Sequence, residues 1–213
     1  MNGVFITGSN TEVGKTTVSV DIIKYLRKKR QIVVRKPVET DCEIINGSFQ
    51  PKDAIKLNEA CSSGESIETV CPFCFELEAS PEEASIHSGR LLELDDLVKA
   101  CRPREDDTFV LVEGAGGLYS PIANKALNSD LATRLDMPVI IVVRDELGAI
   151  SQALLTINAA KSQKLKIACI VLNKIGSSQL DNAEALRAYT EVPIIEYSKN
   201  KLSNFCSEVE GLI

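Results

Sequence analysis

The sequence lacks several features that mark common functional classes. No apolar run within its 213 residues reaches the length that a membrane span needs. The N-terminus shows no basic region, apolar core and cleavage site in succession, so we expect no secretory signal. A formal net charge of −6 argues against the basic face that binds nucleic acid. We therefore expect neither a membrane nor a nucleic acid as a partner.

Metal-binding and redox patterns are also sparse. His87 is the single histidine and has no paired ligand spacing, so we interpret it as a surface or packed residue. Seven cysteines, an odd number, are scattered along the chain, which indicates reduced thiols and a cytoplasmic protein. Cys71 and Cys74 form a CxxC pair, the start of a zinc site or a redox motif. Because no second pair or thioredoxin-like pattern accompanies it, we interpret the pair as incidental thiols.

The rest of the composition is typical of one globular α/β domain covering residues 1–213. The chain is 44% hydrophobic and 25% charged, and no linker or repeat divides it. Near-continuous apolar segments alternate with helical patterns, which predicts a mostly parallel, twisted sheet with helices on both faces. We expect strands at 4–7, 31–35, 109–112, 139–143, 166–172 and 192–195. We expect helices near 15–29, 52–61, 95–101, 128–135, 149–163 and 180–189, and an irregular stretch at 37–94.

The first candidate site is a glycine-bracketed loop between the first strand and the first helix. It runs from Gly8 to Gly14-Lys15-Thr16, where the helix begins. Backbone N–H groups of such a loop, together with the helix N-terminus, bind phosphate. Lys15 can neutralise β- and γ-phosphate charge, and the Thr16 hydroxyl can bind Mg²⁺. Five residues separate the two glycines, where the usual pattern has four.

Further polar residues follow other strands of the predicted sheet. Glu113 ends the strand 109–112 and precedes a glycine-rich turn, where it can hold Mg²⁺ directly or through water. Lys36 ends the strand 31–35, and Pro37 fixes the chain just after it, so we expect Lys36 to face the phosphate site. We expect Lys15 and Lys36 to lie at the ends of neighbouring strands. Asn173 follows another strand. Gly176 stands where GTPases carry the acid that selects guanine, so Asn173 could instead pair with adenine.

Together these motifs resemble the dethiobiotin synthetase family of biotin biosynthesis, within the P-loop NTPase superfamily. The resemblance runs from Gly3 to about Pro193, and the family shares the five-residue loop spacing. Its most specific segments are Thr-Glu-Val-Gly-Lys-Thr at 11–16, Lys-Pro-Val-Glu-Thr at 36–40, Ser-Pro at 80–81, Val-Glu-Gly-Ala-Gly-Gly at 112–117 and Leu-Gly at 147–148.

The resemblance implies a single-domain P-loop fold and a ligase reaction. Carbon dioxide, supplied as bicarbonate, adds to one amine of 7,8-diaminononanoate as a carbamate. ATP phosphorylates the carbamate to a carbamic-phosphoric anhydride, and the second amine closes the ureido ring. The products are dethiobiotin, ADP and phosphate. No nucleophilic side chain is required, because the substrate supplies both nucleophiles.

The resemblance also assigns residues to roles, with ATP as co-substrate and Mg²⁺ as cofactor. Lys15, Lys36 and Thr11 match catalytic positions, and Thr16, Asp53 and Glu113 match the metal positions. The residues that match nucleotide-binding positions are Glu12, Val13, Gly14, Lys15, Thr16, Thr17, Glu113 and Asn173. Thr40 and Lys36 lie beside the diamine. Its carboxylate is held by Gly148, Ala149, Ile150 and Ser151 of the second subunit, which implies a homodimer with shared active sites.

Two departures and three alternatives accompany the resemblance. Glu82 stands where the family often has histidine, and Glu196-Tyr197-Ser198-Lys199 replaces a proline-bearing cover over the adenine. A phosphate-loop kinase for another small acceptor shares Lys15 and Thr16. A partner-regulated ATPase of the septum-site or partition type would carry an extra lysine near Ser9 and Asn10. The third alternative is a nucleotide-binding module without catalysis.

Overall fold

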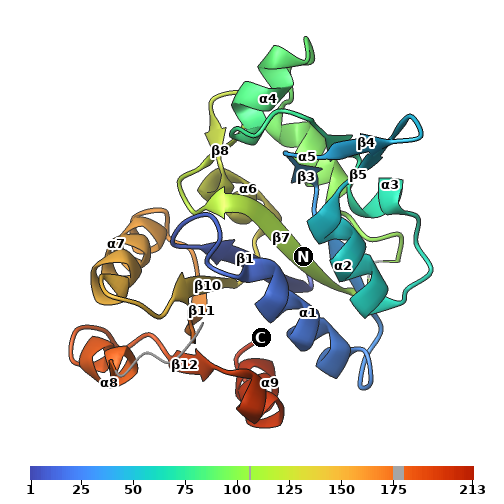
Figure 1. Cartoon of the computed structure of the whole chain (residues 1–213). Coiled ribbons are helices and arrows are strands. Elements are labelled where there is room, and N and C mark those ends of the chain that lie inside the picture. The colour runs from blue at the N-terminus through green and yellow to red at the C-terminus, as the bar shows by residue number, and fades with distance from the viewer. Residues whose placement is uncertain (106, 175–179) are drawn as a thin grey trace.

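The central feature is a six-stranded sheet in which all neighbouring strands are parallel. The computed structural model describes residues 1–105, 107–174 and 180–213. In spatial order the strands are β12-β11-β10-β1-β7-β2 (Figure 1). Their bounds are β1 (Gly3–Gly8), β2 (Ile32–Arg35), β7 (Phe109–Gly117), β10 (Val139–Arg144), β11 (Ile167–Asn173) and β12 (Ile194–Tyr197). The expected parallel α/β architecture is confirmed.

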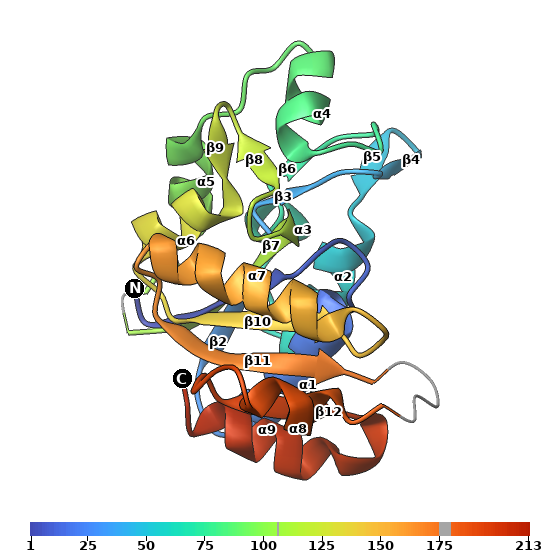
Figure 2. The same cartoon turned by 90° about the vertical axis from the view of Figure 1, so that its left-hand side faces the viewer.

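Helices cover both faces of this sheet, as the continuous apolar strands predicted. The helices are α1 (Lys15–Leu26), α2 (Lys52–Cys61), α3 (Ile67–Val70), α4 (Pro81–His87), α5 (Leu94–Ala100), α6 (Asn128–Leu135), α7 (Ala149–Ser162), α8 (Asn182–Arg187) and α9 (Leu202–Glu210). Buried side chains of α1, α2 and α9 form one apolar layer, and those of α5 to α8 form another. Figure 2 shows α7 lying along β10 and β11.

Alternation along the strands divides the apolar side chains between these two layers. Val4 and Ile6 of β1 join the α1 layer, whereas Phe5 packs in the α7 layer. Phe109 and Val110 of β7 separate in the same way. Both faces are therefore buried, and polar chemistry is confined to the ends of the strands, where the loops emerge.

The segment 37–94 is more regular than the sequence indicated. Besides α2, α3 and α4 it contains the parallel pair β3 (Val38–Glu39) and β6 (Phe73–Cys74), and the hairpin β4 (Glu43–Ile45) and β5 (Ser48–Gln50). Asn46 and Gly47 turn the hairpin with φ of 51° and 79°, the conformation that suits Asn-Gly. The strands β3 to β6 are too short to show a clear hydrophobic period.

Two further differences concern the end of the chain and β7. The helix α9 and the preceding 3₁₀ turn at Lys199–Lys201 were not expected. The strand predicted to end at Val112 continues through the glycines to Gly117, which pairs with Gly8. A second hairpin, β8 (Pro121–Ala123) and β9 (Ala126–Leu127), follows β7. None of the helices in the described residues is both long and apolar enough to cross a membrane.

Candidate active site

The phosphate loop occupies the predicted place between β1 and α1. Gly14 caps α1 with φ of 91°, a left-handed conformation that glycine adopts without strain. A Cβ on Gly8 would lie 2.6 Å from the carbonyl oxygen of Asn10, so glycine is required at the strand exit as well. Lys15 Nζ donates to that same oxygen at 3.2 Å, which draws the lysine over the loop.

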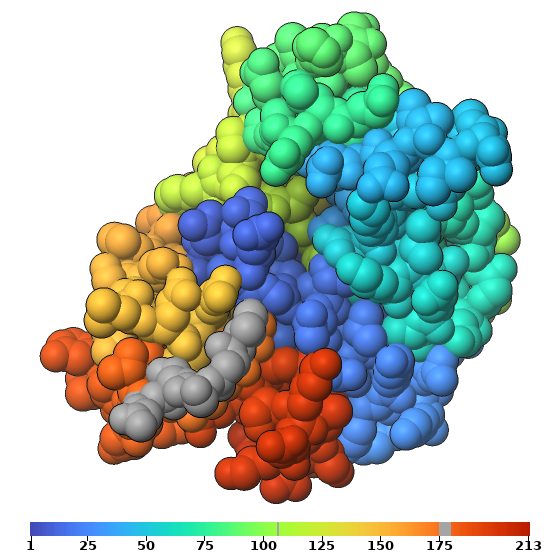
Figure 3. Space-filling view, viewed as in Figure 1, coloured from blue at the N-terminus to red at the C-terminus, as the bar shows by residue number. Residues whose placement is uncertain are grey.

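The loop forms one wall of a polar cavity of about 450 Å³. Figure 3 looks onto this face, where the surface is hollowed between the dark-blue loop residues and the light-blue segment that carries α2. Lys15 and Lys36 both line the cavity, as do Thr40 and Asp53. The remaining predicted residues along it are Thr11, Glu12, Gly14, Thr16 and Thr17. The fold thus brings residues from separate parts of the sequence to one cavity.

Glu113 lies under the cavity and is fully buried. Its Oε1 accepts from the Thr16 hydroxyl at 2.9 Å and from Lys36 Nζ at 2.9 Å. Its Oε2 accepts from the Ser19 hydroxyl at 2.7 Å. Three donors, two from α1 and one from the residue that follows β2, therefore hold this carboxylate. Ser19 was not singled out in the sequence, although it lies one helical turn after Thr16 on α1.

Lys36 lies between two carboxylates. Its Nζ is 2.9 Å from Glu113 Oε1 and 3.8 Å from Asp53 Oδ2. Burial alone would lower the pKa of Lys36, but Glu113, Asp53 and Glu39 outweigh burial and raise it. Lys36 is therefore a permanent cation at neutral pH. One expectation needs correction: Lys15 and Lys36 do not follow neighbouring strands, because β7 with Glu113 lies between β1 and β2.

Lys15 has the opposite electrostatic balance. Burial lowers its pKa to about 8, and the nearby charge of Lys36 adds to this effect, while Glu113 and Asp53 act against it. A cation that is destabilised in the protein alone has most to gain from an anionic ligand, because the ligand supplies the missing counter-charge. This pKa is consistent with a lysine built to receive phosphate.

The donors around Lys36 fit Mg²⁺ bound with a nucleotide. Thr16 supplies a hydroxyl, and Glu113 and Asp53 supply carboxylates, all hard oxygen ligands. The described residues contain no cluster of three or more His, Cys, Asp or Glu side chains suited to a metal ion. Mg²⁺ does not need such a cluster, because it commonly takes one or two carboxylates together with waters and substrate phosphates.

Asn173 is buried against the phosphate loop. Its Nδ2 donates to the carbonyl oxygen of Val13 at 2.8 Å, so the side chain ties the end of β11 to the loop. This contact could not be seen in the sequence, and the expected pairing with adenine stays a prediction. Gly176, which was expected to remove guanine selection, lies outside the described residues. Beyond Thr17 a second hollow, of about 500 Å³, extends to Asp21 and Lys199.

Glu82 and Tyr197, at which the chain departs from the family, have defined hydrogen-bond partners, and so does Thr40. Glu82 accepts from the backbone N–H of Lys125 at 2.6 Å, which fixes the β8–β9 turn. The Tyr197 hydroxyl donates to Asp21 at 2.6 Å, joining β12 to α1. Thr40 donates to the carbonyl oxygen of Ala79 at 3.0 Å.

The predicted carboxylate site lies at the N-terminus of α7. Gly148 caps this helix with φ of 94°, and the preceding Leu147 is 89% exposed. Within the described part of the chain, none of Gly148, Ala149, Ile150 and Ser151 lines the phosphate cavity. The single chain therefore does not bring this segment to its own Lys36.

The thiols of Cys71 and Cys74 lie 3.7 Å apart, and all seven cysteines are free. Cys42 lies beside them, although it is distant in the sequence. Its hydrogen bond to Cys74 lowers the pKa of that thiol, but the Cys71 hydrogen bond and burial raise it to about 12. Protonated thiols of this kind are poor nucleophiles and poor metal ligands at neutral pH.

The parallel sheet, the glycine-capped loop and the buried Glu113 beneath it define a P-loop nucleotide-binding protein. Solved structures of this class share the fold. They include the MinD cell division protein of Aquifex aeolicus (TM-score 0.55, 17% identity, covering 98% of this chain and 87% of that chain). Another is a ParA family ATPase of Chlorobium tepidum (TM-score 0.53, 12% identity, 100% and 92%). These identities show the fold alone.

Sequence comparison is more specific. An AAA domain family model matches residues 2–196. The ATP-dependent dethiobiotin synthetase BioD of Ruthia magnifica is 48% identical over 213 residues, covering 100% of this chain and 99% of the relative. The enzyme of the same name from Bacillus subtilis subsp. natto is 32% identical over 214 residues, covering 98% and 91%. The chain belongs to the dethiobiotin synthetase family.

Proposed function

We propose that the chain catalyses the ATP-dependent carboxylation and ring closure of 7,8-diaminononanoate with CO₂, giving dethiobiotin, ADP and phosphate. The observation that carries this proposal is that Lys15 and Lys36 line one cavity beside the phosphate loop, with the buried Glu113 bonded to Lys36. Full-length similarity to relatives named ATP-dependent dethiobiotin synthetase supports it.

The reaction needs no nucleophile from the protein. One amine of the substrate takes up CO₂ and loses a proton to give a carbamate. A carbamate oxygen attacks the γ-phosphorus, the bond to the β-phosphate bridging oxygen breaks, and ADP leaves. The second amine then attacks the carbonyl carbon of the mixed anhydride, phosphate leaves, and the ureido ring closes. The chemical task of the protein is positioning and charge stabilisation.

The main electrostatic difficulty of the reaction is that an anionic carbamate must approach an anionic phosphate. The two lysines reduce this repulsion. In this proposal Lys15 holds the β- and γ-phosphates, and Lys36, which follows β2 on the other side of β7 and Glu113, meets the carbamate. Preorganised cations in a site of low dielectric constant stabilise the charge that develops in the transition state. Thr11 and Glu12 line the same cavity and would contact the same groups.

Mg²⁺ bound with the nucleotide would be held by Thr16, Asp53 and Glu113. When bound, it neutralises phosphate charge and fixes the geometry of the triphosphate. Glu113 is oriented for this task by the Thr16 and Ser19 hydroxyls. We propose that Gly14 and Thr17 bind phosphate, that Val13 supports the loop through Asn173, and that Asn173 also contacts the base.

We further propose a homodimer in which each active site is completed by the partner. Thr40 would lie beside the diamine, and the N-terminus of α7 from the second copy would bind its carboxylate through free N–H groups. Leu147 and Leu155, at 89% and 68% exposure, and the half-exposed Tyr119 leave apolar surface around α7 for a second copy to cover. The free thiols and the use of ATP favour the cytoplasm as the compartment.

A coupled assay tests the reaction. ADP release from ATP and Mg²⁺ should require both 7,8-diaminononanoate and bicarbonate. A phosphate-loop kinase would release ADP with the diamine alone, and a partner-regulated ATPase would release it without either. Turnover that ignores bicarbonate in a CO₂-depleted buffer would rule out the proposed reaction.

A further inference from the structure

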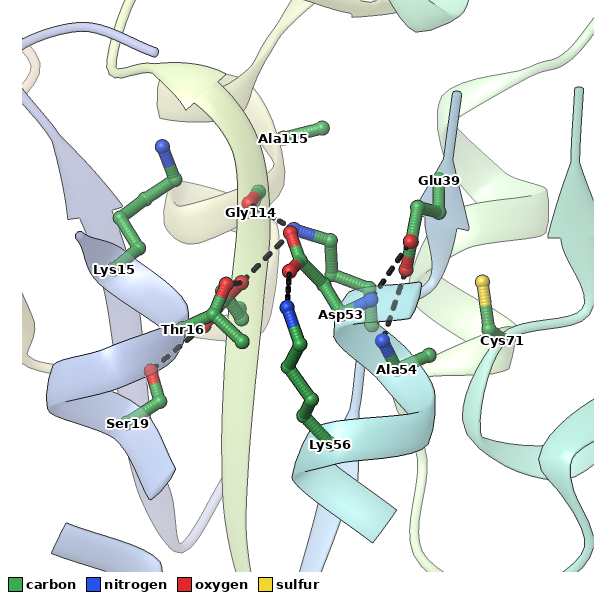
Figure 4. A network of polar contacts seen from close by, with 12 residues as sticks. Lys15, Thr16, Ser19, Glu39, Asp53, Ala54, Lys56, Cys71, Gly114 and Ala115 are labelled. Atoms are coloured by element: carbon green, nitrogen blue, oxygen red, sulfur yellow. Dashed lines mark hydrogen bonds and ion pairs between the residues drawn. The ribbon is translucent and has the colours of Figure 1, made fainter. Parts of the chain in front are cut away.

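Glu39 belongs to the Lys36–Thr40 segment, yet none of the roles above uses it. Its side chain is buried on β3, with 8% of the residue exposed. Both of its carboxylate oxygens accept backbone N–H groups from the first turn of α2 (Figure 4). Oε1 accepts from Asp53 N at 2.8 Å, and Oε2 accepts from Ala54 N at 2.9 Å.

These contacts make Glu39 the cap of α2. The first N–H groups of a helix have no partner within the helix, and the positive end of the helix dipole favours an anion there. The residue at the N-cap position is Pro51, whose side chain makes no capping hydrogen bond. A carboxylate from a different element, β3, therefore fixes the start of α2 relative to the cavity.

The first turn of α2 also carries Asp53, whose carboxylate must be oriented correctly in the site. Asp53, whose own N–H is held by Glu39, directs Oδ2 toward Lys36 Nζ at 3.8 Å. Lys56 approaches Oδ1 of the same carboxylate at 3.6 Å. The Asp53 side chain is 37% exposed, so packing alone does not fix its direction. Its orientation depends on the backbone of the turn that Glu39 holds.

We propose that Glu39 is a positioning residue for the Mg²⁺ site. It locks the first turn of α2 so that the Asp53 carboxylate faces Lys36 and the phosphate cavity. Glu39 acts through Asp53 and does not bind the metal itself. The proposal rests on the assignment of Asp53 to Mg²⁺ in the proposed function, and it adds a residue that no metal ligand pattern would select.

The test measures Mn²⁺ binding in the presence of ADP by electron paramagnetic resonance, for wild type, Glu39→Gln, Asp53→Asn and the double variant. Glutamine has the same shape but turns an NH₂ group toward one of the two N–H donors. We expect Glu39→Gln to weaken Mn²⁺ binding roughly tenfold, as for other residues that orient a metal ligand. If Glu39 acts through Asp53, the double variant should bind no more weakly than Asp53→Asn alone.

Asp130→Asn is the matched control. Asp130 Oδ2 accepts from Leu127 N at 2.7 Å at the start of α6, away from the phosphate cavity. We expect this variant to lose thermal stability without a change in Mn²⁺ affinity. Glu39→Asp keeps the charge but reaches only one N–H group, and its affinity should fall between those of wild type and Glu39→Gln. If Glu39→Gln does not fold, Glu39→Asp tests the proposal in its place.

Two results would overturn the proposal. One is wild-type Mn²⁺ affinity in folded Glu39→Gln or Glu39→Asp. The other is a double variant weakened by the product of the two single effects, which would make Glu39 an independent ligand. Mn²⁺–ADP binding needs no diamine. A protein that binds Mn²⁺–ADP but does not close the ring would count against the proposed reaction, while the effect of Glu39 on Mn²⁺ affinity would still be measured. Absence of Mn²⁺–ADP binding in wild type would contradict both.

Discussion

Lys36 and Glu113 form a buried ion pair, with Nζ and Oε1 separated by 2.9 Å. The pair joins the end of β2 to β7 at the floor of the phosphate cavity. The Lys36 ammonium is therefore held in one place before any ligand arrives. A cation fixed in this way pays little reorganisation cost when negative charge develops beside it.

Replacing Lys36 should remove this charge with little change in shape. We expect Lys36→Gln to lower turnover at least about a hundredfold, the usual effect of losing one preorganised donor in a transition state. Glutamine still offers a hydrogen bond to Glu113, so the melting transition should persist. Lys52→Gln is the control, because that lysine is exposed and pairs with Glu43 outside the site. Wild-type turnover in Lys36→Gln would remove Lys36 from the mechanism.

The pKa of Lys15 predicts how nucleotide binding depends on pH. A pKa of about 8 means that Lys15 loses its charge as the pH rises through about 8. Affinity for Mg²⁺–ADP, measured by calorimetry, should then fall by up to about tenfold per pH unit above that value. In Lys15→Arg the guanidinium stays charged, so this decline should disappear even if binding is weaker overall.

Stability should move in the opposite direction over the same range. The folded state lowers the pKa of Lys15, so between about pH 8 and 10.5 the unfolded chain binds more protons than the native one. The Lys15 contribution to the free energy of unfolding therefore increases as the pH rises through this window. Comparing urea midpoints of wild type and Lys15→Gln isolates that contribution. If the Mg²⁺–ADP affinity and the Lys15 contribution to the free energy of unfolding both fell as the pH rose, the lowered pKa assigned to Lys15 would be contradicted.

Shared active sites can be tested with two inactive proteins. Lys15→Gln removes the phosphate contact, and Ser151→Glu places an anion at the N-terminus of α7, at an exposed position that tolerates it. Each homodimer should be nearly inactive. Random mixing of subunits of a twofold dimer should restore about a quarter of the wild-type sites, because each heterodimer has one intact composite site. Native mass spectrometry verifies that subunits have exchanged. If activity does not recover after exchange, the phosphate loop and the N-terminus of α7 of each active site belong to the same chain.

The CxxC pair should be dispensable. The thiols of Cys71 and Cys74 lie 3.7 Å apart, the pKa of Cys74 is raised to about 12, and serine is close to cysteine in size. We expect the Cys71→Ser, Cys74→Ser double variant to keep its turnover and to contain no metal after purification. Elemental analysis of both proteins checks this. Stoichiometric zinc in the native protein that is lost from the variant would show that the pair is a metal site.

The sequence predicted the parts of the fold that depend on local pattern. The helices expected at 52–61 and 128–135 have these bounds in the structure, because their hydrophobic periods are clear. Lys36 was expected at a strand exit and lies there. Strand order was not accessible, since β7 enters between β1 and β2 from a distant part of the sequence.

The missed contacts share one physical property: each joins segments that lie apart in the sequence. Ser19 reaches Glu113, Glu39 reaches the backbone of α2, and Asn173 reaches Val13. None of these contacts can be read from a motif, because each depends on the partner that folding brings to the side chain. Lys15 and Thr16 were found because the phosphate loop is local in sequence.

The central claim, that CO₂ is fixed into the ring at the expense of ATP, can be measured directly. The purified chain would be incubated with ATP, Mg²⁺, 7,8-diaminononanoate and ¹³C-bicarbonate, and the product analysed by mass spectrometry. We expect one dethiobiotin per ADP formed, with the ¹³C in the ureido carbonyl, and product formed at least about a hundredfold more slowly by Lys36→Gln. ADP formation without a labelled ureido product would contradict this function for the chain.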